Sequence, residues 1–68
     1  MRLIKESTGI QVKTGDIAHD FNGEAAIVTG WQEPRHAGST GRVYVKEMGD
    51  RGFTGEYYPS VYGMKWVD

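Results

Sequence analysis

The chain contains no cysteine among its 68 residues. Disulfide bonds, thiolate metal sites and cysteine nucleophiles are therefore excluded. Because secreted proteins of this size usually carry disulfides, the missing cysteine predicts a cytoplasmic protein.

Long apolar runs are missing as well. No stretch approaches the length of about 18 apolar residues that a transmembrane helix needs. The opening residues, MRLIKESTG, lack the apolar segment of a signal peptide. We therefore expect no membrane partner.

The charges show no excess of one sign over the whole chain. Eight Lys and Arg residues face nine Asp and Glu residues, which gives a formal net charge of -1. A dedicated nucleic-acid binder would show a basic stripe. Cations gather only in residues 35–51, which carry Arg35, Arg42, Lys46 and Arg51 against Glu47 and Asp50.

Patterns that carry catalysis are also scarce. His19 and His36 are the only histidines, and neither has neighbours at the spacing of a metal motif. Ser39-Thr40-Gly41 has hydroxyls but lacks the preceding glycine-rich motif of a phosphate loop. We therefore expect no catalytic residue, no metal, no cofactor and no enzyme activity.

Glycines and short alternating runs are abundant. The ten glycines indicate turns, and alternation of apolar and polar residues is typical of strands. Asn22-Gly23 predicts a type I′ hairpin turn, and Gly30 predicts a bulge or a close backbone approach. Strands are expected at residues 2–5, 16–21, 24–32, 41–48, 53–58 and 64–67, and a 3₁₀ turn at residues 59–62; residues 10–13 either pair or lie flat.

These elements predict a single all-β domain over residues 1–68, a small barrel of five or possibly six strands. The eight aromatic residues are expected to supply much of its core. Regular alternation places Trp31 on one face with Ala25 and Ile27. It also turns Val43 and Val45 inward.

The strand at residues 41–48 carries the most distinctive candidate for binding. Alternation places Tyr44 on its outer face between Arg42 and Lys46. Such a face suits a protein contact, where Tyr and Arg are enriched, or single-stranded nucleic acid, which stacks on aromatic rings. Alternatively, the Arg and Lys stems simply cover the tyrosine ring.

Two neighbouring segments complete the candidate binding face. Tyr57 and Tyr58 must point to opposite sides of a regular strand, so one is expected in the core and the other outside. The loop from residue 35 to residue 41 adds polar and cationic groups. The candidate binding residues are Arg35, His36, Arg42, Tyr44, Lys46, Tyr57 and Tyr58.

Two segments resemble Src-homology-3 domains. Tyr58, Pro59, Ser60 and Tyr62 match the Pro-Ser-Asn-Tyr segment that carries a 3₁₀ turn in that family, and residues 18–21 (AHDF) resemble its opening motif. The family's long acidic loop is missing, because only nine residues separate Phe21 from Trp31. The resemblance implies the family's barrel but not its groove for proline-rich peptides.

A second resemblance covers more of the chain. Residues 12–17 (VKTGDI) and the segment from Gly23 to Gly30 are similar to the opening of Src-homology-3-like barrels of the KOW and Tudor type. Those barrels bind RNA, ribosomes, RNA polymerase or modified peptides. The short chain also resembles the accessory proteins of tailed bacteriophages and prophages, which would place it in the host cytoplasm.

Three functions follow as expectations. The first is a phage-type binding module that docks on another protein through its aromatic and basic face. The second is nucleic-acid binding by the same residues in the KOW manner. The third is a structural protein that self-associates through an exposed edge strand, although we expect a monomer.

Overall fold

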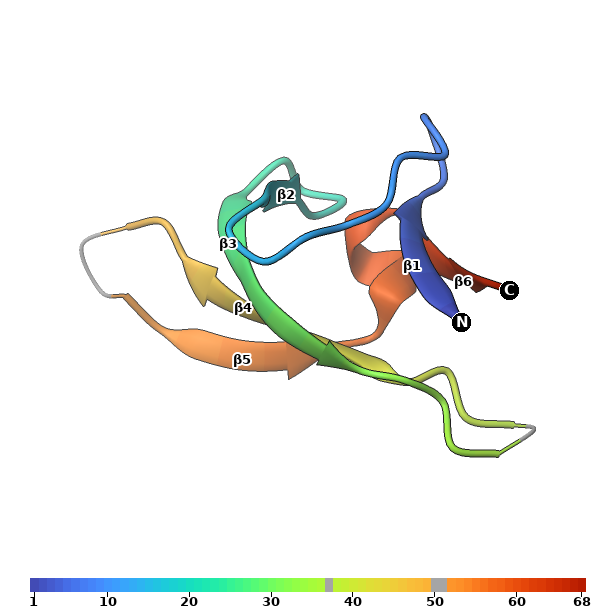
Figure 1. Cartoon of the computed structure of the whole chain (residues 1–68). Coiled ribbons are helices and arrows are strands. Elements are labelled where there is room, and N and C mark those ends of the chain that lie inside the picture. Colours follow the sequence, from blue (N-terminus) through green and yellow to red (C-terminus); the bar gives the residue numbers. More distant parts are fainter. Residues whose placement is uncertain (37, 50–51) are drawn as a thin grey trace.

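The computed structural model describes residues 1–36, 38–49 and 52–68. It confirms the expected all-β chain, and these described residues form six strands and one 3₁₀ helix (Figure 1). The expected turn at residues 49–52 and the loop at residues 35–41 each include positions outside the described residues. The elements are β1 (Arg2–Lys5), β2 (Ile17–His19), β3 (Ala25–Gln32), β4 (Arg42–Glu47), β5 (Thr54–Tyr57), η1 (Pro59–Tyr62) and β6 (Met64–Val67).

The strands pair in two antiparallel sheets. The larger sheet has the order β2-β3-β4-β5, and the smaller sheet pairs β1 with β6. The smaller sheet brings the two ends of the chain side by side (Figure 1). Residues 10–13 add one isolated bridge, between Gln11 and Ile4, and form no strand of their own.

The hairpin between β2 and β3 forms as expected, but its turn differs from the predicted type I′. Gly23 has a φ of 84°, and every positive φ among the described residues belongs to a glycine, so Asn22 does not adopt the required left-handed conformation. The amide of Gly23 donates to the carbonyl of Asp20, and the amide of Asp20 donates to the carbonyl of Glu24. This is a three-residue loop, a type I turn followed by a left-handed glycine.

The side chain of Asp20 accounts for this choice of turn. Its Oδ1 accepts hydrogen bonds from the amides of Asn22 and Glu24, at 2.9 and 3.0 Å. An Asp side chain that accepts from the backbone two residues onward stabilises such a turn locally. The three-residue loop is therefore specified by Asp20, two residues before the Asn-Gly pair.

A bulge in β3 changes the face on which Trp31 lies. Val28 pairs with Val45, whereas Trp31 pairs with Val43, because the register shifts between Val28 and Gly30. Val28 and Trp31 therefore point to the same side, and Trp31 packs against the core. The expectation that Trp31 shares a face with Ala25 and Ile27 is wrong, because an inserted residue reverses the alternation.

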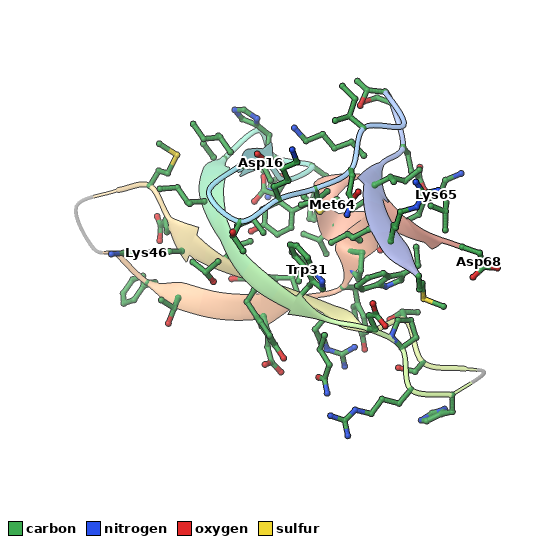
Figure 2. All side chains as sticks on the ribbon, in the orientation of Figure 1. Asp16, Trp31, Lys46, Met64, Lys65 and Asp68 are labelled. Atoms are coloured by element: carbon green, nitrogen blue, oxygen red, sulfur yellow. The ribbon has the colours of Figure 1, made fainter. Side chains whose placement is uncertain are left out.

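The buried core is aliphatic, which corrects the expectation of an aromatic core. Among the described residues its eight members are Leu3, Val12, Ala18, Ala26, Val28, Val43, Val45 and Met64. Three aromatic residues, Trp31, Tyr62 and Trp66, pack against it while only partly buried. Two small sheets enclose little volume, so Val and Ala fill the interior and the large rings lie at its margin. Figure 2 shows Trp31 and Met64 between the two sheets.

The 3₁₀ helix η1 forms where proline was expected to end the preceding strand. Pro59 begins the helix and is buried, and its fixed φ suits the first position. Gly63 ends the helix with a φ of 64°, and its amide donates to the carbonyls of Pro59 and Ser60. The described residues contain no helix that is long and apolar enough to cross a membrane.

Candidate functional site

Strand β4 presents alternate side chains to the two faces of the larger sheet. Val43 and Val45 are buried, as expected, whereas Arg42 and Tyr44 are half-buried and Lys46 is exposed. The ring of Tyr44 covers Gly30 on the neighbouring strand, since a Cβ at Gly30 would lie 3.4 Å from Tyr44 Cδ2. Because Gly30 has no side chain, the Tyr44 ring can lie over the backbone of β3 at this position.

Arg42 is held in place by two contacts. Its Nη1 donates to the carbonyl oxygen of Gly41 at 2.8 Å. Its guanidinium carbon lies 4.3 Å from the centroid of the Tyr58 ring. A cation–π contact of this kind contributes about 0.5–1 kcal/mol at an exposed site. Arg42 and Tyr58 therefore form a pre-ordered pair, with Tyr58 still 52% exposed.

The amide of Gln32 joins Arg35 to the same surface. In the orientation that satisfies its neighbours, the amide oxygen accepts from Arg35 Nε and Nη2, both at 3.2 Å. The other end of the amide lies 3.4 Å from the hydroxyl of Tyr44. Gln32 also lies directly opposite Arg42 in the sheet register.

These residues form one continuous surface, which we call the Arg42 face. It consists of Gln32, Arg35, Arg42, Tyr44, Glu56 and Tyr58. Glu56 lies opposite Tyr44 on β5, so the face carries a carboxylate as well as two cations. A hollow of about 250 Å³ opens beside it, and its lining includes Arg35, Arg42 and Glu56.

Lys46 and Tyr57, both expected in the binding face, are placed differently. Lys46 shares the outer side of β4 with Arg42 and Tyr44, whereas Tyr57 does not. Lys46 pairs with Thr54 toward the turn between β4 and β5 (Figure 2). Tyr57 pairs with Val43 and points to the inner side of the sheet, where it meets Tyr62 edge-to-face at a centroid distance of 5.7 Å. Neither Tyr57 nor Tyr58 joins the core, because both are exposed.

Tyr57 and Tyr62 form one wall of a small acidic pocket that sequence reasoning missed. Its volume is about 100 Å³, and its lining also includes Asp20, Glu24 and Glu47. Burial, followed by the charges of Tyr57 and these three carboxyl groups, raises the pKa of Tyr62 above its ordinary value. Acidic residues at successive strand ends are the sequence signal that could have predicted this cluster.

A larger apolar groove runs beneath the loop that follows β3, and it too was missed. It measures about 690 Å³, and its apolar lining includes Pro34, Pro59, Met64 and Trp66. The indole Nε1 of Trp66 donates to the carbonyl oxygen of Thr40 at 2.7 Å. We call this feature the Trp66 groove. Prolines after one strand and before the last strand, with a tryptophan in the last strand, were its signals in the sequence.

The two histidines lie in different parts of the structure. His36 lines the Trp66 groove, whereas His19 is exposed on β2. Among the described residues, no three His, Cys, Asp or Glu side chains are placed to hold a metal ion. The described part of the loop at residues 35–41 borders both the Arg42 face and the Trp66 groove.

The chain was compared with known protein families, curated proteins and solved structures. No protein-family model, no curated protein and no solved structure matches the chain.

Proposed function

We propose that this protein is a non-enzymatic binding module that docks on another protein through the Arg42 face. The observation that carries the proposal is Arg42 itself, stacked on Tyr58 and hydrogen-bonded to Gly41. Arg and Tyr are enriched among the residues that dominate protein interfaces. Because the pair is already ordered, binding loses less side-chain entropy than it would with mobile side chains.

We further propose that the two sheets form a small Src-homology-3-like barrel of the KOW or Tudor type. Three features support this interpretation: the pairing of the first strand with the last, the 3₁₀ helix before the last strand, and the meander β2-β3-β4-β5. The size suits a phage-type accessory protein in the host cytoplasm. These assignments rest on the resemblance and on the topology together.

Nucleic acid is the second candidate for the same face. Arg35, Arg42 and Tyr44 offer charge and stacking, which is how single strands are bound. Glu56, however, lies directly opposite Tyr44, where it would repel phosphates. This carboxylate favours a protein partner, whose own cations can pair with it.

Affinity capture from bacterial lysate tests the proposal. Wild-type protein, the variant Arg42→Ala/Tyr58→Ala and the control Lys13→Ala/Phe21→Ala serve as baits. The control likewise removes one cation and one exposed aromatic ring, but both lie outside the Arg42 face. Captured proteins are identified by mass spectrometry, before and after nuclease treatment and over a series of salt concentrations.

We expect wild type and control to capture the same partner protein. The Arg42→Ala/Tyr58→Ala bait should bind it at least about tenfold more weakly, since each interface anchor is worth more than 1 kcal/mol. Equal capture by all three baits would reject the Arg42 face. Capture that nuclease abolishes, and that weakens steeply with salt, would instead identify nucleic acid as the partner.

A further inference from the structure

The Trp66 groove is an apolar surface with rigid walls. Pro34 and Pro59 have fixed φ angles, and Met64 is buried at its floor. Trp66 is anchored by its hydrogen bond to Thr40. Because this bond uses the indole's single donor, the ring presents only apolar surface to the groove.

Gly41 holds the groove in shape. It is buried with a φ of 67°, and a Cβ there would lie 2.5 Å from the carbonyl oxygen of Gln32 and 3.0 Å from Trp66 Nε1. The loop therefore approaches the tryptophan as closely as only glycine permits. A groove that is formed before binding loses little conformational entropy when a ligand enters.

The rim of the groove is mainly cationic. Arg35 and Lys65 are exposed at its edges, together with His36. Among the described residues that line it, Glu6 is the one carboxylate. Its backbone amide bonds to Gly63, so Glu6 is located where η1 meets β6. Figure 2 shows Lys65 on the two-stranded sheet.

We propose that the Trp66 groove receives a linear segment of the partner protein in which a bulky apolar side chain is flanked by carboxylates. The apolar side chain would cover Trp66, Pro34 and Pro59, and the carboxylates would face Arg35 and Lys65. The inference rests on the proposed function, because Arg35 belongs both to this rim and to the Arg42 face. One partner could therefore engage both surfaces at once.

The first test uses two probes with the same apolar part and opposite charge, 3-phenylpropionate and 3-phenylpropylamine. Each is titrated into the full-length, ¹⁵N-labelled protein, and the two indole N–H resonances are followed by NMR. Trp66 reports on the groove, whereas Trp31 packs against the core and serves as an internal control. Ligands this small are expected to bind with roughly millimolar dissociation constants.

We expect 3-phenylpropionate to shift the Trp66 resonance in a saturable manner, to leave Trp31 unchanged, and to bind more tightly than the amine. In Arg35→Ala/Lys65→Ala the carboxylate should bind roughly three- to tenfold more weakly, since each exposed charge pair contributes modestly. The control Lys13→Ala/Lys46→Ala removes two exposed cations elsewhere and should bind as wild type does. No saturable shift at Trp66, or equal binding of the two probes, would overturn the proposal.

The second test asks for the peptide itself. A library of random heptapeptides displayed on a surface is selected on the wild-type protein, and binders are eluted with 3-phenylpropionate. We expect enriched sequences to combine an aromatic or large aliphatic residue with Asp or Glu, and to lose binding to Arg35→Ala/Lys65→Ala. Enrichment of basic sequences, or no enrichment at all, would contradict the proposal.

The experiments can reject the Arg42 face and the Trp66 groove independently of each other. If the probe binds at Trp66 but the Arg42→Ala/Tyr58→Ala bait captures its partner normally, the groove stands and the Arg42 face does not. If that bait loses its partner while the probe never shifts Trp66, the Arg42 face stands and the groove proposal is rejected.

Discussion

At the scale of single residues, Gly41 connects the fold to the candidate surfaces. Its neighbour Arg42 bonds to its carbonyl oxygen, and its Cα faces both Gln32 and Trp66. A side chain here would meet backbone on one side and the anchored indole on the other. The Arg42 face and the Trp66 groove therefore depend on the same glycine.

We predict that Gly41→Ala destabilises the protein by at least about 2 kcal/mol, because it adds steric conflict to the cost of a positive φ. Gly9→Ala is the matched control, since Gly9 has a similar φ of 72° but nothing within 4 Å of a Cβ. The control should cost about 1 kcal/mol from backbone strain alone. Urea unfolding measures both values, and equal losses would show that the loop does not pack on Trp66 as described.

Tyr62 provides a second prediction at this scale. Its pKa is raised, first by burial and then by the negative groups around it. A spectrophotometric titration should therefore show a phenol that ionises above the ordinary value of about 10, and Tyr62→Phe should remove that component. A titration curve that keeps this component in the variant would contradict the assignment.

The sign of the effect on stability follows from the same shift. Above pH 10 the unfolded chain loses the Tyr62 proton while the folded chain still holds it. The contribution of Tyr62 to the free energy of unfolding is therefore fully present below pH 10 and falls as the pH rises through the folded pKa. Wild type should lose more stability than Tyr62→Phe in that range.

At the scale of elements, the turn between β2 and β3 differs from the turn type predicted from the sequence. The type I′ turn predicted from Asn22-Gly23 would require a left-handed Asn22, whereas the observed loop uses Asp20 as a backbone acceptor. We predict that Asp20→Ala costs about 1 kcal/mol, in line with the loss of a side chain that caps backbone amides. Asn22→Ala should be nearly neutral.

Thermal or urea unfolding of the two variants decides between the turn types. A left-handed Asn22 would make Asn22→Ala the more damaging change, because alanine disfavours that conformation. If Asn22→Ala lowers the free energy of unfolding more than Asp20→Ala does, the result contradicts the three-residue loop. A variant with both changes provides the check on additivity.

Most elements could be predicted from the sequence, because alternation and turn residues are local signals. The strands near residues 2–5, 41–48 and 64–67, the 3₁₀ helix at Pro59 and the inward direction of Val43 were all predicted correctly. The face of Trp31 could not be predicted, since one inserted residue reverses alternation and its position depends on the partner strand. Gly30 indicated a bulge in the sequence, but it did not indicate that the bulge turns Trp31 to the other side of the sheet.

The candidate site was harder to predict than the fold. Arg35, Arg42, Tyr44 and Tyr58 do lie on one surface, as the strand pattern suggested. Lys46 shares their side of β4 but lies toward the turn between β4 and β5, whereas Tyr57 points to the inner side of the sheet. The Trp66 groove combines segments that are distant in the sequence. Such a groove depends on the packing of the two sheets. The prolines and the tryptophan mark its walls in the sequence, but nothing local in the sequence shows that they meet.

At the scale of the whole molecule, the larger sheet leaves β2 and β5 at its edges. Exposed edges can pair with another copy, but short edge strands limit that tendency. These two strands have three and four residues, and β5 contains Gly55. We therefore predict a monomer in sedimentation velocity at micromolar concentration, and a dimer would favour the self-associating alternative.

The central claim is that the protein binds another protein through the Arg42 face. The measurement that tests it most directly is the affinity of the captured partner for wild type, Arg42→Ala/Tyr58→Ala and Lys13→Ala/Phe21→Ala, by calorimetry in low and moderate salt. We predict at least about tenfold weaker binding for Arg42→Ala/Tyr58→Ala alone, with a shallow dependence on salt. Equal affinities for all three proteins would contradict the claim.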